Sequence, residues 1–160
     1  MFCEMQYMMQ LRKMITKARH TGIVVRDLSN AIDFYLGLGF EPFLREMEQG
    51  EFIDQVVNLS NAKVETAKLI SPCGFLLELL QYHSHPESKE INLQSSNQLG
   101  CSHIAFTVLS IDKVLKKICS IGGTCLNPPA TSSHGKVKVA YCHDPEGNLL
   151  ELVEEIPGAL

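Results

Sequence analysis

The chain contains two short stretches that are nearly identical, GFLLEL at 74–79 and GNLLEL at 147–152. Each is introduced by a turn signal with Pro at the second position and Gly at the fourth, SPCG in the first case and DPEG in the second. Each also sets one glutamate, Glu78 or Glu151, among leucines. A carboxylate among apolar side chains is costly unless it pairs with a base or binds a metal. The duplication therefore predicts two similar β-hairpins, each holding one glutamate for a specific role.

A longer repeat surrounds these hairpins. The stretch HTGIVVRDLSNAIDFYLGLGF begins at His20, and HIAFTVLSIDKVLKKICSIGG begins at His103. Each opens with histidine, continues through a short β-branched run and reaches polar residues that favour the start of a helix. A helical pattern follows, and glycines end it. The polar residues are Asp27 and Ser29 in the first copy and Ser110 and Asp112 in the second.

Each copy therefore reads as a strand, a helix and then further strands. The predicted strands after the helix are 40–46, 52–58, 63–70 and 75–82 in the first copy, and 123–126, 136–142 and 148–154 in the second. This pattern predicts an α+β fold of two tandem modules that share one core, because an isolated module would leave a sheet face bare. The predicted organisation is a helical appendage at 1–17, a first module at 18–82, a polar linker at 83–100 and a second module at 101–156.

The composition limits the classes of function. Of the 160 residues, 45% are hydrophobic and 20% are charged, which is typical of one globular domain. The net charge of −4 argues against nucleic acid or an anionic membrane as the main partner. No apolar run approaches the ~20 residues of a membrane span.

The N-terminus and the cysteines indicate a cytoplasmic protein. The first residues lack the apolar run and the cleavage site of a secretory signal. The six cysteines form no C-x-x-C pair. They are therefore expected to be small core residues rather than zinc ligands.

The two histidines and the two glutamates form the strongest candidate site. Residues on both sides of each glutamate are apolar on both strand faces, so each carboxylate should point into a partly enclosed space. Neither strand carries a Lys or Arg two residues from its glutamate to neutralise it. Two imidazoles and two carboxylates suit one divalent ion: Ni²⁺, Zn²⁺, Co²⁺, Mn²⁺ or Fe²⁺. The predicted ligands are His20, Glu78, His103 and Glu151.

These features together resemble the vicinal oxygen chelate superfamily, which includes glyoxalase I, methylmalonyl-CoA epimerases, extradiol dioxygenases and fosfomycin- and bleomycin-resistance proteins. The resemblance rests on HTGIVVRDLSNAIDFYLGLGFE, LLELLQY, GCSHIAFTVLSIDKVLKKICSIGG and YCHDPEGNLLELVE, and it covers about 18–156. It implies two βαβββ modules that form a cupped, incomplete mixed β-barrel around a metal. The metal positions of the family fall on the four predicted ligands.

The resemblance also implies an activity. A His/Glu/His/Glu set is most similar to glyoxalase-I-type lyases, the lactoylglutathione lyases. It implies a metal-dependent lyase or isomerase that moves a proton next to the carbonyl of a small carbonyl or thioester substrate. Glu78 or Glu151 would be the base, and the family pattern favours Glu151. The chain lacks the Arg after the first ligand and the Asn after the second that hold glutathione in glyoxalase I, which argues against glutathione as co-substrate. The sequence does not decide whether glutathione or coenzyme A is used.

Three other functions remain open at this point. Methylmalonyl-CoA epimerases look similar but commonly have Gln at the position of Glu78. Fe(II) extradiol dioxygenases use two histidines and one glutamate. Non-catalytic resistance proteins usually lack the metal set. Many members of the family pair two chains, so a homodimer is expected.

Further polar residues are weaker candidates for substrate binding. His134 lies in a Ser- and Gly-rich stretch that could close over a substrate. Lys136 and Lys138 could meet a phosphate or carboxylate, although solvated surface positions explain them better. Asp54 falls on the predicted strand 52–58 and Glu51 falls at its edge. Their spacing of three residues places them on opposite faces of a strand.

Overall fold

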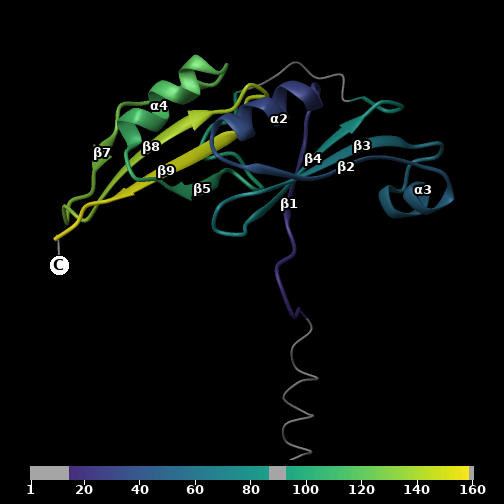
Figure 1. Cartoon of the computed structure of the whole chain (residues 1–160), viewed down its shortest axis with the longest axis horizontal. Helices are drawn as coiled ribbons and strands as arrows, with labels where there is room; N and C mark the ends of the chain where they lie inside the picture. The colour runs from purple at the N-terminus through teal and green to yellow at the C-terminus, as the bar shows by residue number, and fades with distance from the viewer. Residues whose placement is uncertain (1–14, 87–92, 159–160) are drawn as a thin grey trace, which may run out of the picture.

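The computed structural model describes residues 15–86 and 93–158, so most of the predicted appendage at 1–17 lies outside the described residues. None of the helices in these two ranges combines the length and the apolar character needed to cross a membrane. The chain forms two β-sheets with helices against them, and the first and second halves of the chain each build one sheet (Figure 1).

The first module contains a four-stranded sheet in the order β1-β4-β3-β2. Strand β1 runs parallel to β4, and the other neighbours are antiparallel. Its elements are β1 (Thr21–Val24), α2 (Leu28–Gly37), β2 (Glu41–Gln49), α3 (Glu51–Val57), β3 (Lys63–Ile70) and β4 (Leu76–Tyr82).

The second module repeats this plan with the order β5-β9-β8-β6, and a short β7 also pairs with β8. Strand β5 is parallel to β9, as β1 is to β4. The elements are β5 (Ile104–Thr107), α4 (Ile111–Ser120), β6 (Thr124–Cys125), β7 (Ala130–Thr131), β8 (Val137–His143) and β9 (Leu149–Glu155). The predicted α+β fold of two repeated modules is therefore confirmed.

The two predicted hairpins form with matching turns. The Gly74 amide donates to the Ser71 carbonyl at 2.9 Å, and the Gly147 amide donates to the Asp144 carbonyl at 3.1 Å. Both are the one-to-four hydrogen bonds of a β-turn. Because the two turns have the same length, residues at the same distance from them occupy equivalent places in the two sheets.

The two helix starts use different caps. The Asp27 carboxylate accepts a hydrogen bond from the Asn30 amide at 3.0 Å, so Asp27 caps α2 as predicted. Ser110 stands at the equivalent position of α4, but its side chain makes no capping bond. Instead, Oε2 of Glu154 on β9 accepts from the Ile111 amide at 2.7 Å. A carboxylate from the neighbouring strand thus satisfies the helix end that a serine was expected to satisfy.

The predicted strand 52–58 is wrong, because this segment forms the helix α3. Gly50 has a φ of 100° and turns the chain away from the direction of β2. Asn58 has left-handed backbone angles and ends the helix. Ile53 and Val57 lie one helical turn apart and pack on a small cluster against the first sheet. The β-branched composition suggested a strand, whereas the four-residue apolar spacing is helical.

Glu51 and Asp54 do not lie on opposite faces of a strand, because both belong to the helix α3. The Asp54 carboxylate accepts from the backbone amides of Asn61 and Ala62 at 2.8 and 2.7 Å. Glu51 accepts from the Gln55 side chain, one helical turn away. Asp54 therefore fixes the loop that leads into β3.

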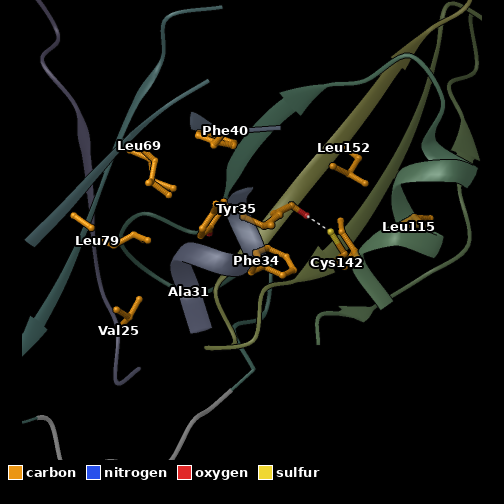
Figure 2. Close-up of a cluster of buried hydrophobic side chains, with 14 of the residues drawn as sticks. Val25, Ala31, Phe34, Tyr35, Phe40, Leu69, Leu79, Leu115, Cys142 and Leu152 are labelled. Atoms are coloured by element: carbon orange, nitrogen blue, oxygen red, sulfur yellow. Dashed lines mark hydrogen bonds between the residues drawn. The ribbon is translucent and has the colours of Figure 1, made fainter. Parts of the chain in front are cut away.

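A single core joins the modules. Figure 2 shows Phe34 and Tyr35 of α2 between Leu69 and Leu79 of the first sheet and Cys142 of the second, and all of these residues belong to one buried cluster. The predicted shared core is therefore present.

The bond between Tyr35 and Asp144 is the main polar link across this core. The Tyr35 hydroxyl donates to Oδ2 of Asp144 at 2.9 Å. Burial raises the pKa of Asp144, although hydrogen bonds from the amides of Glu146 and Asn148, the Asn148 side chain and Tyr35 oppose this change. The DPEG turn is thus anchored to a helix of the first module.

Candidate metal and catalytic site

The first candidate pair is His20 with Glu78. In the parallel pairing of β1 and β4, Gly22 lies opposite Glu78, and His20 stands two residues before Gly22. The imidazole and the carboxylate meet there, with Nε2 of His20 3.0 Å from Oε2 of Glu78. The parallel strand pair thus brings together two residues that are far apart in sequence.

The second pair, His103 with Glu151, has the same construction. Ala105 lies opposite Glu151 in the pairing of β5 and β9, and His103 stands two residues before Ala105. Nε2 of His103 lies 2.9 Å from Oε2 of Glu151. The other ring nitrogen, Nδ1, lies 2.8 Å from the Ser102 hydroxyl, which orients the imidazole. Each module thus joins one histidine with one glutamate of the predicted four-ligand set.

The two pairs differ in their neighbour on the adjacent strand. Lys68 lies opposite Glu78 in the β3–β4 hairpin, and its Nζ is 3.3 Å from Oε1 of Glu78. Tyr141 occupies the equivalent place beside Glu151, and its ring packs edge-on against His103 with centroids 5.4 Å apart. Burial, and then the charge of Glu151, raise the pKa of Tyr141.

Lys68 was missed by the sequence reasoning, which considered only residues on the strands of the glutamates themselves. A usable signal exists, because residues can be paired outward from the SPCG turn. This pairing places Ile70 opposite Leu76 and Lys68 opposite Glu78. Glu78 therefore has two basic neighbours, His20 and Lys68. The spacing of residues along its own strand did not reveal Lys68.

The pairs do not gather into one cluster within a single chain. In residues 15–86 and 93–158, no three His, Cys, Asp or Glu side chains come close enough to hold a metal ion together. Each pair is nevertheless open to solvent, since His20 is 28% exposed and His103 is 32% exposed. Each pair therefore offers one nitrogen and one oxygen donor to a ligand approaching from outside.

The space near His103 is a small cavity of about 220 Å³. Residues of both β1 and β5 line it, among them Gly22 and Ile23, together with Cys101 and Asn148. A larger cavity of about 800 Å³ lies between α4 and the SPCG turn and is lined mainly by apolar residues such as Phe40, Phe75 and Phe106. The four predicted ligands do not line this larger cavity.

The weaker candidates lie away from the two pairs. His134 is exposed in a turn closed by the Ser132 carbonyl and the Gly135 amide, and Lys136 is exposed just before β8. Lys138 pairs with Glu154, with Nζ 3.6 Å from Oε1. Because strand residues alternate faces, Lys138 lies on the opposite face of the sheet from Glu151.

Comparison with known proteins finds relatives over most of the chain. Residues 17–152 match the family model of the Glyoxalase/Bleomycin resistance protein/Dioxygenase superfamily. A probable lactoylglutathione lyase from a Synechocystis species is 26% identical over 143 residues, which cover 84% of this chain and 92% of that protein.

Solved structures show the same fold. A glyoxalase family protein from Bacillus cereus superposes with a TM-score of 0.82 at 26% identity, over 89% of this chain and 95% of that chain. A variant of the fosfomycin resistance protein FosX from Listeria monocytogenes, complexed with Mn(II) and 1S,2S-dihydroxypropylphosphonic acid, gives a TM-score of 0.61 at 17% identity. This second match covers 91% of this chain and 95% of that one.

Proposed function

Because the chain belongs to the Glyoxalase/Bleomycin resistance protein/Dioxygenase superfamily, we propose that it is a divalent-metal-dependent lyase or isomerase. Its reaction is the movement of a proton on the carbon next to a carbonyl, as in a lactoylglutathione lyase. The observation that carries this proposal is the pair of His–Glu contacts, 3.0 and 2.9 Å long, at equivalent register positions of the two sheets.

The chemistry of these residues fits a divalent metal. Each pair places an imidazole nitrogen within 3.0 Å of a carboxylate oxygen, and both atoms are donors that Ni²⁺, Zn²⁺, Co²⁺, Mn²⁺ and Fe²⁺ accept. His20, Glu78, His103 and Glu151 would hold the ion. When bound, the ion supplies Lewis-acid stabilisation of negative charge on a carbonyl oxygen.

A homodimer would bring four donors together. Since the two pairs stay apart within the described part of one chain, the proposed site takes His20 and Glu78 from one chain and His103 and Glu151 from a second. Exposed apolar side chains on the sheet face that carries Glu78 support assembly. Leu44, which lies opposite Lys68, is 40% exposed, and Phe52 and Val56 of α3 are 75% and 62% exposed.

Glu151 is the better placed of the two glutamates to move the proton. Both oxygens of Glu78 have a partner, Oε2 with His20 and Oε1 with Lys68. Within the described residues, Glu151 has only the contact of Oε2 with His103, so Oε1 is available to accept a proton from a substrate carbon. Tyr141 lies opposite Glu151 in the pairing of β8 with β9, and its ring packs against His103.

Lys68 favours a substrate with a negative charge. Two carboxylates and one divalent ion are formally neutral together, so the ammonium of Lys68 leaves one positive charge at the site. A positive charge without a counter-charge in a partly enclosed site is stabilised by a negatively charged group on the substrate. The proposed substrate is therefore a small carbonyl or thioester compound that also carries a carboxylate or phosphate group.

Replacement of Lys68 tests this charge. We expect Lys68→Met to weaken oxalate binding to the Ni²⁺-loaded protein about tenfold, because the ammonium no longer attracts the anion. Lys68→Arg should keep most of the affinity, and the matched control Lys138→Met should keep all of it, since Lys138 faces away from the site. Titration calorimetry measures the three constants. Equal oxalate affinity in Lys68→Met and the wild type would remove Lys68 from the site.

Metal addition tests the proposal as a whole. After treatment with a chelator, the protein should melt at a higher temperature when Ni²⁺ or Zn²⁺ is added. An ion at a hundredfold excess over its dissociation constant stabilises by about 2.7 kcal/mol. Sedimentation in the same samples measures whether the chain is a dimer. Absence of both metal binding and a melting shift would instead favour a binding protein of the resistance type.

Turnover separates the remaining activities. The metal-loaded protein should convert a hemithioacetal, a 2-oxo thioester or an acyl-CoA ester without consuming oxygen. Oxygen uptake with a catechol in the presence of Fe²⁺ would instead identify an extradiol dioxygenase. The two assays use the same protein sample, so each serves as the control for the other.

A further inference from the structure

Two cysteines of the second module lie in direct contact. Cys119 is in the last turn of α4 and Cys125 is in β6, and their sulfur atoms are 2.7 Å apart. This separation is only about 0.7 Å longer than an S–S bond. Both residues are exposed, and neither is bonded to another cysteine. An oxidant in solution can therefore reach the pair.

The backbone between the two cysteines fixes this contact. After α4, the amide of Gly123 donates to the carbonyl of Ile118 at 3.0 Å, which turns the chain back toward the sheet. Thr124 and Cys125 then pair with His143 and Cys142 of β8. The helix end and the strand are therefore each held by backbone hydrogen bonds, and formation of a covalent bond requires little movement.

We propose that Cys119 and Cys125 form a reversible intrachain disulfide on reaction with a hydroperoxide. The site lies on the α4 side of the second sheet, whereas Glu151 lies on the other face. The proposal therefore does not depend on the proposed metal site.

The reaction proceeds in two balanced steps. The Cys119 thiolate attacks one peroxide oxygen, the O–O bond breaks, and Cys119 becomes a sulfenic acid while the alkoxide or hydroxide leaves and takes a proton from water. The Cys125 sulfur then attacks the Cys119 sulfur, the S–O bond breaks, and water leaves with the thiol proton. The two thiols lose two electrons and the hydroperoxide gains them.

The environment assigns these two roles. The Cys125 thiol donates to the Leu115 carbonyl at 3.7 Å, and partial burial, and then the neighbouring Cys119, raise its pKa to about 11, so this residue keeps its proton and reacts second. Cys142 beneath it is buried, and burial raises its pKa to about 12. Cys142 therefore stays a thiol in the core, and Cys119 is the member of the group that a peroxide attacks.

Cys73 provides an internal comparison. It is exposed, and the Ser71 hydroxyl at 3.1 Å, followed by the backbone of Phe75, lowers its pKa. Among the described residues, no second sulfur contacts it. Cys73 should therefore also form a sulfenic acid, but one without a neighbouring thiol to convert it into a disulfide.

Hydrogen peroxide with dimedone, a reagent that traps sulfenic acids, tests the proposal on the full chain. We expect peptide mapping without reductant to find Cys119 linked to Cys125. The linked peptides should be lighter by two hydrogen atoms than the reduced peptides, and dithiothreitol should restore both free thiols. Dimedone should label Cys73 but not Cys119 in the wild type. In Cys125→Ser, dimedone should label Cys119, because the second step is removed.

The oxidised wild type should also melt about 5 °C higher than the reduced protein, since the bond restrains the unfolded chain. The control Cys73→Ser should form the same link at the wild-type rate. Absence of the Cys119–Cys125 peptide in the oxidised wild type would overturn the proposal. Dimedone labelling of Cys119 at equal levels in the wild type and in Cys125→Ser would do so as well.

Discussion

Replacing Glu151 by Gln is expected to reduce turnover by roughly 10²–10⁴-fold, because the variant loses the oxygen that accepts the substrate proton. The amide can still accept a hydrogen bond from His103, so the fold should be kept. The measurement is kcat on the substrate found by screening, with metal content measured on the same sample. Glu155→Gln is the matched control, since Glu155 is exposed at the end of the same strand.

Glu78→Gln should act through metal affinity alone, because both oxygens of Glu78 contact basic side chains and neither is available as the base. We expect metal affinity to fall by about 10–100-fold or more, the cost of losing even an indirect partner of a metal. If neither glutamine variant lowers metal content or turnover, the four-residue assignment is wrong.

Mixing the two inactive variants tests whether the site spans two chains. In a mixed dimer of Glu78→Gln and Glu151→Gln, one of the two sites carries both substitutions and the other carries neither. When equal amounts of the two variants exchange subunits at random, half of the dimers are mixed and half of the sites in those dimers are unsubstituted. The mixture should therefore regain about a quarter of the wild-type rate. A site built within one chain would remain inactive in every mixture. The control is a mixture of the wild type with Glu151→Gln, in which activity should fall in proportion to the wild-type share.

The hairpins were predictable because their turn chemistry is local. Pro at the second position and Gly at the fourth of SPCG and DPEG specify a turn, and the turn fixes the register of the strands beside it. The same register could have shown that Lys68 lies opposite Glu78. The association of His20 with Glu78 was predicted from the repeat and not from a local turn. The two residues are far apart in sequence, but they occupy the same places in the first copy as His103 and Glu151 in the second.

Other features depended on contacts that the sequence does not display. The segment 52–58 has a composition suited to a strand, but Gly50 and the burial of Ile53 against the first sheet favour a helix. The cap of α4 comes from Glu154, which is distant in the sequence. The separation of the two His–Glu pairs within the described chain depends on how the modules pack through α2, and no local pattern encodes that packing.

The junction of α4 with the sheet should tolerate added volume poorly. A Cβ atom at Gly123 would lie 2.6 Å from the carbonyl oxygen of His143 and 2.6 Å from Cγ2 of Ile118. It would also lie 3.0 Å from Cε2 of Phe34 on α2. The carbonyl belongs to the backbone of β8 and cannot rotate away, so the helix end must shift from the sheet.

Gly123→Ala is therefore expected to destabilise the fold by about 1–3 kcal/mol, the usual cost of overpacking a core. Gly37→Ala is the matched control, because its Cβ would meet only side-chain atoms, with Cδ1 of Ile121 at 3.0 Å and Cε of Lys117 at 3.6 Å as the nearest contacts. Alanine also favours the helix α2 by up to about 1 kcal/mol, so this control should be close to neutral. Urea unfolding of both variants gives the two free energies. A Gly123→Ala protein as stable as Gly37→Ala would mean that α4 is free to move from the sheet, and that the Cys119–Cys125 contact is not held by the backbone.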